Sequence, residues 1–157
     1  MCYRERGCSR MSEKYNDVMQ LEKQLCFPLY AASREVIKRY RPYLDALGLT
    51  YTQYIVLLVI WETGTISVRD LGRRLYLDSG TLTPVLKTLE KNGLIIRRRS
   101  EKDERVLLVS VTRDGRALRD KAGEIPQAIR ASVRLSDREA ETLVALVNKI
   151  LASSGDE

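Results

Sequence analysis

The sequence contains no histidine, and this absence removes whole classes of chemistry. Histidine is the commonest general base in enzymes and the commonest protein ligand of zinc. The three cysteines are Cys2, Cys8 and Cys26, and no two of them form a C-x-x-C pair. We therefore expect no hydrolytic triad, no metal site and no cofactor, and we do not expect an enzyme.

Long apolar runs are also absent. No stretch approaches the roughly 20 apolar residues that a membrane-spanning helix needs, and the opening MCYRERGCSR lacks the apolar segment of a signal peptide. Apolar residues make up 44% of the chain and charged residues 31%, which is typical of a folded domain. The sequence predicts a cytoplasmic protein with no membrane association and with reduced thiols.

Acidic residues are in the minority. The chain has 27 lysines and arginines against 21 aspartates and glutamates, a net charge of +6. This excess suits a polyanionic partner, although cations dispersed over the whole surface would give the same total. Between residues 66 and 111, ten basic and six acidic residues contribute +4 of it (10 − 6), so the positive charge is concentrated mid-chain.

At 157 residues the chain has the length of one ordinary domain. Residues 1–16 are polar and lack apolar periodicity, so we expect a flexible tail there, with Met11 as an alternative start. Residues 17–157 are expected to form the domain.

Helical periodicity covers both ends of this domain. A long amphipathic helix is predicted over about 17–47, ended by Gly48, and further helices over about 112–153, with a bend at Pro126. Capping-box patterns at Thr50 with Gln53 and at Ser136 with Glu139 predict two helix starts.

The middle of the domain, about 50–111, has the order of a winged helix-turn-helix. Ser67 with Asp70 predicts the start of a short helix, and Asp78 precedes another helix, which the pair Asn92-Gly93 ends. The runs LIIRRRS and RVLLVSV, separated by EKDE, predict a two-stranded hairpin. The expected fold class is mainly α with a small β-wing, in which dimerisation helices flank the winged helix-turn-helix.

The segment DSGTLTPVLKTLEK carries the polar side chains that a DNA-reading helix needs. Hydroxyls and cations contact base edges and phosphates. Outside its leucine stripe this helix offers Ser79, Thr81, Thr83, Lys87 and Thr88. Ser79 taken alone fits a helix cap better, but the combination favours DNA contact.

The hairpin gathers five basic residues: Arg97, Arg98, Arg99, Lys102 and Arg105. A basic wing lies over phosphates or enters the minor groove, although a solvated hairpin would also carry such charges. Asp103, two residues before Arg105, is placed to hold that guanidinium in a bidentate pair. The candidate DNA-binding residues of the wing are Arg97, Arg98, Asp103 and Arg105.

The helices over 17–47 and 112–153 present more apolar surface than the central unit can cover, and dimerisation is the economical use of that surface. A two-fold dimer sets two recognition helices about one turn of DNA apart, roughly 34 Å. The sequence therefore predicts a homodimer on an inverted-repeat site in double-stranded DNA.

Cys26 lies inside the first predicted helix, where a lone cysteine is by default a small buried hydrophobe. Pro28 has no N–H to donate to Gln24, so we expect the helix to kink or restart near Cys26. A thiol at a helix start is more readily ionised, which favours a reactive Cys26.

Five of the eight tyrosines lie between residues 30 and 54: Tyr30, Tyr40, Tyr43, Tyr51 and Tyr54. Phenols can hydrogen-bond a thiolate, but they also fill wet interfaces with amphipathic rings. We favour the second role for Tyr43 and Tyr54.

These residues resemble a known family, the MarR-type winged-helix repressors, and within it the organic-hydroperoxide regulators called OhrR. The resemblance runs from about Leu21 to Thr112 and continues more weakly through the C-terminal helices. It is carried by LEKQLCF, LYAASRE, LTYTQYIVLLVIWE, LYLDSGTLTPVLKTLEKNGLI and RRRSEKDER.

The resemblance implies that organic hydroperoxides oxidise Cys26 to a sulfenic acid, after which the dimer releases its DNA. It implies that Tyr40 and Tyr51 hydrogen-bond this cysteine across the subunit boundary, and that Tyr30 lies in the same pocket. It also implies DNA contacts by Ser79, Thr81 and Thr83 and by a wing pair of Asp103 with Arg105.

Three departures from the family qualify this resemblance. No cysteine follows Cys26, which is typical of the one-cysteine branch, where a low-molecular-weight thiol captures the sulfenic acid. Cys2 or Cys8 is the alternative resolving residue. Thr88 stands where some relatives carry arginine, and Pro28 is the third departure, so the operator and the peroxide sensitivity do not carry over.

Two other functions remain open from the sequence. A repressor of the same fold could be released by a non-covalent lipophilic or aromatic ligand, with Cys26 as a packing residue. A thiol peroxidase would turn Cys26 over catalytically, but the sequence offers no histidine and no resolving cysteine beside it.

Overall fold

The computed structural model describes residues 19–152. Contacts between residues divide the chain into two compact units, with the boundary between Lys38 and Arg39. This boundary lies inside one helix, α2 (Cys26–Ala46). The predicted tail over 1–16 lies outside the described residues.

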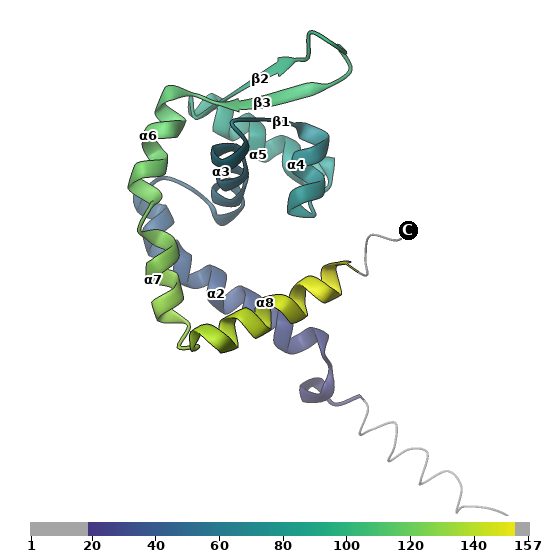
Figure 1. Cartoon of the computed structure of the whole chain (residues 1–157), viewed down its shortest axis with the longest axis vertical. Coiled ribbons are helices and arrows are strands. Elements are labelled where there is room, and N and C mark those ends of the chain that lie inside the picture. Colours follow the sequence, from purple (N-terminus) through teal and green to yellow (C-terminus); the bar gives the residue numbers. More distant parts are fainter. Residues whose placement is uncertain (1–18, 153–157) are drawn as a thin grey trace, which may run out of the picture. The chain divides into compact units, whose positions relative to one another are not determined.

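The described residues form the elements drawn in Figure 1. In chain order they are η1 (Leu21–Lys23), α2 (Cys26–Ala46), α3 (Tyr51–Thr63), β1 (Thr65–Ser67), α4 (Val68–Leu75), α5 (Ser79–Lys91), β2 (Ile95–Arg99), β3 (Leu107–Val111), α6 (Arg113–Ala122), α7 (Ile125–Ser132) and α8 (Asp137–Ala152). The fold class is therefore mainly α with a small antiparallel sheet, as the sequence predicts.

Helix α2 begins at Cys26, after a short 3₁₀ turn, rather than at the start of the predicted 17–47 segment. Pro28 is the third residue of the helix, a position where its missing N–H costs no intrahelical bond. The expected restart of the helix near Cys26 is confirmed. At the other end Gly48 takes a φ of 67°, a left-handed conformation that glycine adopts without steric cost.

Both predicted capping boxes are present. The Thr50 N–H donates to Gln53 Oε1 at 2.8 Å, and the Gln53 N–H donates to Thr50 Oγ1 at 3.3 Å. In α8 the Ser136 N–H donates to Glu139 Oε2 at 2.9 Å, and the Glu139 N–H donates back to Ser136 Oγ at 3.4 Å. Side chains thus satisfy backbone donors that a helix start leaves free.

The sheet has three antiparallel strands in the order β1-β3-β2, one more than the predicted hairpin. The additional strand β1 pairs Thr65 with Ser110 and Ser67 with Leu108. In β2 and β3, Ile95 pairs with Val111. Strand β1 ties the start of α4 to the base of the wing.

The core of the unit that begins at Arg39 lies between α3 and the leucine stripe of α5. Helix α3 is apolar almost all round and buries Tyr54, Leu57 and Ile60. Helix α5 contributes Leu82, Leu86 and Leu89, and all three are buried. Because one face of α5 is committed to this core, its opposite face remains for a partner.

Helix α6 is packed tightly against this core at Gly115. A Cβ at that position would lie 2.1 Å from the Leu94 carbonyl oxygen, so only glycine allows the approach. Trp61 Nε1 donates to the Gly115 carbonyl oxygen at 2.8 Å. The predicted bend at Pro126 is a break between α6 and α7, with Pro126 in the first turn of α7.

Within residues 19–152, no single helix is long and apolar enough to cross a membrane. Among the described helices, the bent pair of α2 and α3 has the length and composition of a span when the two are taken together.

Candidate nucleic-acid interface and redox site

Helix α5 begins at a well-made cap. Asp78 accepts a hydrogen bond from the Thr81 N–H at 2.9 Å and a second one from the Thr81 hydroxyl at 2.9 Å. The backbone bond from Thr81, followed by the hydroxyl bond, holds the pKa of Asp78 below its usual value. The cap fixes the first turn of the helix that the sequence assigns to DNA contact.

The predicted contact residues of α5 share its exposed side. Ser79, Thr83 and Lys87 recur at steps of four and form one stripe, away from the buried leucines. Thr83 donates its hydroxyl proton to the Ser79 carbonyl oxygen at 2.6 Å, as Thr81 does to Asp78. Both threonines therefore keep a hydroxyl lone pair and a methyl group free. The lone pair can accept a hydrogen bond from a base, and the methyl group can contact a thymine methyl.

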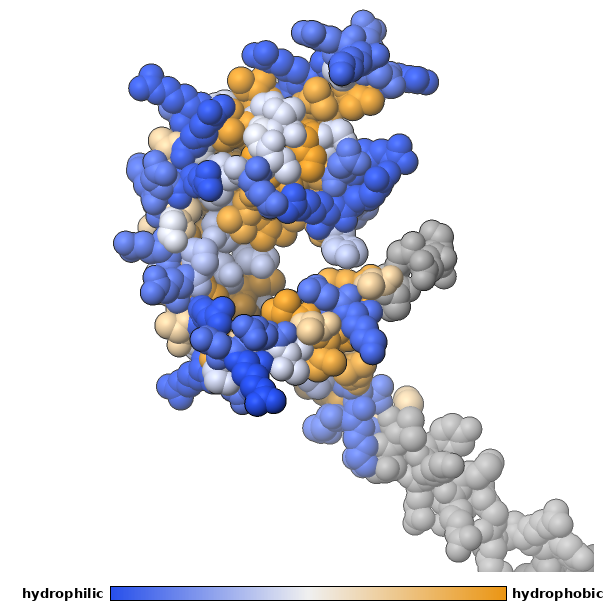
Figure 2. All heavy atoms as spheres, in the orientation of Figure 1, coloured by the Kyte–Doolittle hydropathy of each residue, from blue (hydrophilic) through white to orange (hydrophobic). Residues whose placement is uncertain are grey.

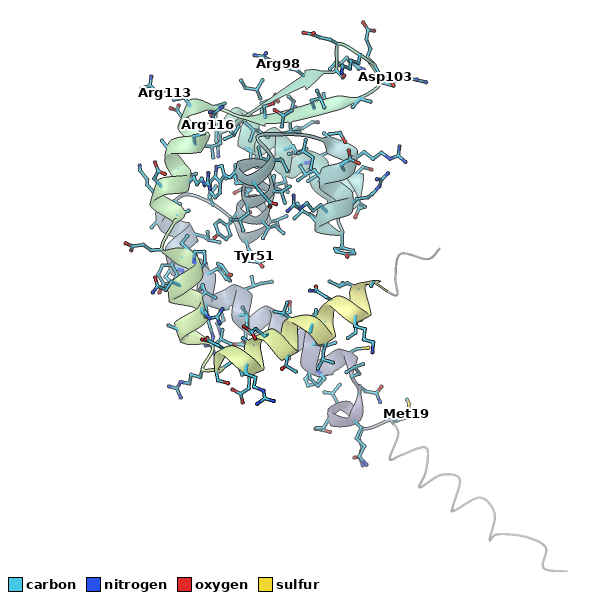
Figure 3. All side chains as sticks on the ribbon, in the orientation of Figure 1. Met19, Tyr51, Arg98, Asp103, Arg113 and Arg116 are labelled. Atoms are coloured by element: carbon cyan, nitrogen blue, oxygen red, sulfur yellow. The ribbon has the colours of Figure 1, made fainter. Side chains whose placement is uncertain are left out.

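The wing loop over 100–106 is ordered by its own hydrogen bonds. Arg105 donates to Asp103 Oδ1 at 3.0 Å through Nε and to Asp103 Oδ2 at 3.3 Å through a terminal nitrogen, so the expected bidentate pair is confirmed. The pair lowers the pKa of Asp103. The Arg105 side chain is 91% exposed, and Figure 3 places Asp103 in the loop beyond β2 and β3. Asp103 thus orients the guanidinium of Arg105, which remains accessible to a ligand.

Arg97 and Arg98 differ, because successive residues of β2 face opposite sides of the sheet. Arg98 is exposed. Arg97 is 21% exposed and turns to α5, where its Nε donates to Glu90 Oε2 at 2.9 Å and its backbone N–H to Glu90 Oε1 at 3.2 Å. The side-chain hydrogen bond from Arg97 lowers the pKa of Glu90. Sequence reasoning missed Glu90, because nothing local links a helix residue to one on the next strand.

Cys26 is the first residue of α2, and its thiol is exposed on the chain described here. Its large neighbours Leu25, Phe27 and Tyr30 are exposed as well. Arg34 donates to the Tyr30 phenol oxygen at 3.0 Å and lies over its ring at 5.5 Å. Arg34 is a second residue that sequence reasoning missed; its four-residue step from Tyr30 is the signal that points to it.

The structure brings Tyr40 and Tyr51 together. Their ring centroids lie 5.0 Å apart in an edge contact, and Tyr54 lies 5.8 Å from Tyr40. Burial raises the pKa of all three phenols above the usual value of 10.0, and neighbouring phenols add to the rise at Tyr40 and Tyr54. Tyr54 is fully buried, whereas Tyr43 is exposed on this chain.

The predicted redox residues fall in both units: Cys26 and Tyr30 precede the boundary at Lys38, and Tyr40 and Tyr51 follow it. Among residues 19–152, no group of three or more cysteine, aspartate or glutamate side chains is arranged to hold a metal ion.

Comparison with known proteins finds a family and close relatives. The family model described as transcriptional regulator SarA/Rot matches residues 38–122. The organic hydroperoxide resistance transcriptional regulator of Bacillus subtilis (strain 168) is 50% identical over 141 residues, which is 90% of this chain and 95% of that protein. The HTH-type transcriptional regulator SarZ of Staphylococcus aureus (strain USA300) is 42% identical over 142 residues, or 90% and 96%.

The chain is also similar to solved structures of DNA-bound proteins. Reduced AbfR bound to DNA, a protein of Staphylococcus epidermidis, has a TM-score of 0.71 and 34% identity, covering 88% of this chain and 97% of that one. Overoxidized AbfR bound to DNA has a TM-score of 0.71 and 35% identity, covering 88% and 98%.

Proposed function

Since the chain belongs to the MarR family of winged-helix transcriptional regulators, in its organic-hydroperoxide-sensing OhrR branch, we propose that it represses transcription as a homodimer whose switch is Cys26. The dimer holds an inverted-repeat operator in double-stranded DNA. It releases this operator when an organic hydroperoxide oxidises Cys26. Such a protein works in the cytoplasm, on the chromosome.

The observation that carries this proposal is the position of Cys26. Its thiol is open at the first residue of a helix, with apolar side chains exposed around it. A thiol at a helix start is the kind that oxidants attack. The apolar surroundings suit an organic hydroperoxide better than hydrogen peroxide.

We propose that the dimer forms through the apolar faces of the terminal helices, 17–47 and 112–153. Leu25 is 69% exposed and Val144 is 58% exposed, and α8 also exposes Leu143, Leu146 and Ile150. Figure 2 shows apolar side chains along α8 and hydrophilic ones over the wing. Large apolar side chains exposed on one helix, as on α8, are typical of an interface.

The segment 50–111 makes the DNA contacts in this proposal. Ser79, Thr81, Thr83 and Lys87 enter the major groove, and Arg98 with the Asp103–Arg105 pair meets the neighbouring minor groove or its phosphates. Arg97 contributes by fixing β2 to α5 through Glu90.

The chemistry at Cys26 is a two-electron oxidation. The sulfur attacks the outer oxygen of R–O–O–H, the O–O bond breaks, and the departing alkoxide takes the proton and leaves as the alcohol R–OH. Cys26 becomes a sulfenic acid, which a low-molecular-weight thiol converts to a mixed disulfide with release of water. The partner subunit's Tyr40 and Tyr51, which are neutral phenols at physiological pH, are the hydrogen-bond donors to the sulfur.

Oxidation must change the balance between the DNA-bound and released states. Emptying a nearly full operator takes a difference of about 5 kcal/mol between the two states. A bulky mixed disulfide at Cys26, on the helix that also carries Tyr40, has the size to shift the two winged units of the dimer out of register.

The test is DNA binding, followed by fluorescence anisotropy on a duplex from the gene's own upstream region at stated salt. We expect the wild type to release the duplex after one equivalent of cumene hydroperoxide with a small thiol, and Cys26→Ser to stay bound. The double variant Cys2→Ser/Cys8→Ser is the control and should respond like the wild type.

Release of Cys26→Ser by the hydroperoxide would contradict the proposal. Release of neither protein would favour a non-covalent lipophilic or aromatic inducer instead. Sustained peroxide consumption by sub-stoichiometric protein would identify a thiol peroxidase.

A further inference from the structure

A hollow of about 600 Å³ lies between the start of α4 and the wing loop. Residues 67–70 form one wall, and residues 103 and 105–107 form the other. The two walls are brought together by the pairing of Ser67 with Leu108 in the sheet. In Figure 1 the wing extends past β1 on the side where α4 lies.

One of the arginines that line the hollow, Arg69, forms no ion pair with a described residue. Asp103 is paired with Arg105, and Asp70 accepts from the Ser67 hydroxyl at 2.6 Å and pairs with Arg73 at 3.3 Å. Arg69 is exposed and forms no ion pair with any residue in the range 19–152. The lining holds two arginines and two aspartates, and because Arg73 outside the hollow pairs with Asp70, the charge of Arg69 is not neutralised by a neighbouring carboxylate.

A DNA duplex would present one kind of group at this place. The first helix of a helix-turn-helix crosses the DNA backbone, and a wing lies over the adjacent groove. Between them passes the sugar-phosphate ridge that separates the two grooves. The apolar wall of Val68, Val106 and Leu107 suits a deoxyribose, and the flanking guanidiniums suit its phosphate.

We propose that this hollow seats one backbone phosphate of the operator, with Arg69 and Arg105 donating hydrogen bonds to its oxygens from opposite sides. This inference rests on the proposed function, and it adds Arg69 to the DNA-binding residues. Because a phosphate contact carries no sequence information, Arg69 fixes the position of the duplex and does not select its bases.

The experiment compares the wild type, Arg69→Ala and Arg69→Lys by fluorescence anisotropy on the operator and on a scrambled duplex over a series of salt concentrations. The logarithm of the binding constant falls linearly with the logarithm of the salt concentration, and removing one phosphate contact makes this slope less steep by about 0.9. At about 0.15 M salt this corresponds to about fivefold weaker binding. We expect this loss in Arg69→Ala on both duplexes, and a slope close to that of the wild type in Arg69→Lys.

Arg119→Ala is the matched control. Arg119 is exposed on α6, has no ion pair with any residue between 19 and 152, and does not line the hollow. Its slope should equal that of the wild type. Equal melting temperatures of the variants show that the fold is retained.

Methylphosphonate substitution identifies the partner on the DNA. Neutralising the single phosphate that Arg69 contacts should weaken DNA binding by the wild type. The wild type and Arg69→Ala should then bind this duplex with equal affinity. An unchanged slope in Arg69→Ala, a loss confined to the operator, or no position that removes the advantage of the wild type would each overturn the inference. Failure of the wild type to bind any duplex would overturn the proposed function instead.

Discussion

Tyr40, Tyr51 and Tyr54 bury their phenols against one another, and this raises the pKa of each above 10.0. A group with a raised pKa binds its proton more tightly in the folded chain. Its contribution to stability is therefore complete below pH 10 and is lost as the pH rises through the folded value. We expect the free energy of unfolding to fall above about pH 10, and to fall less steeply in Tyr40→Phe, which has one phenol fewer to ionise.

Urea titrations between pH 8 and pH 11 measure this fall. Tyr43→Phe is the control, because Tyr43 lies on the same helix and is 42% exposed, and this variant should follow the wild type. A Tyr40→Phe profile parallel to that of the wild type would show that burial of these phenols has no effect on their ionisation.

Between elements, the contact of Glu90 on α5 with Arg97 on β2 ties the wing to the helix proposed to read DNA. We expect Glu90→Gln and Arg97→Gln each to weaken operator binding severalfold, and the double variant to be no weaker than the worse single one, because both changes break the same link. The measurement is anisotropy on the operator over a series of salt concentrations.

The salt dependence of operator binding distinguishes a positioning role of Arg97 from a direct contact with DNA. If Arg97 acts through Glu90, the slope of Arg97→Gln equals that of the wild type, as in Glu90→Gln. A salt slope less steep by about 0.9 in Arg97→Gln alone would mean that Arg97 binds a phosphate itself. Additive losses in the double variant would refute the shared link.

Local signals predict most of these elements. The capping boxes at Thr50 and Ser136 and the pair Asp103–Arg105 each span four residues or fewer, so the sequence reveals them directly. Strand β1 has three residues, Thr65–Ser67, too few for an alternating pattern, and it exists only because β3 lies beside it. The Glu90–Arg97 pair and the tyrosine cluster each join one element to the next, and the approach of Arg69 to the wing joins distant segments, so periodicity within one element predicts none of the three.

At the scale of the whole molecule, the proposed function requires a second copy of the chain. We expect Ile150→Asp to convert the dimer to a monomer, since it places a charge on the apolar face of α8, and to abolish tight operator binding because each monomer reaches one half-site. Sedimentation equilibrium measures the oligomeric state, and anisotropy on full and half operators measures the binding.

Asn148→Asp is the matched control, with the same charge introduced on the same helix at an exposed polar position. It should remain dimeric. A dimeric Ile150→Asp that binds the full operator like the wild type would show that α8 does not form the interface.

Trp61, the one tryptophan of the sequence, stands at the junction of α3 and α6, bonded to the Gly115 carbonyl and 6.4 Å from the ring of Tyr54. The chain thus carries a built-in fluorophore where the DNA-binding core meets the helices that lead to α8. Excitation absorbed by the tyrosine cluster reaches this indole over a short distance. Its emission gives a label-free optical record of whether oxidation at Cys26 disturbs that junction, and how fast.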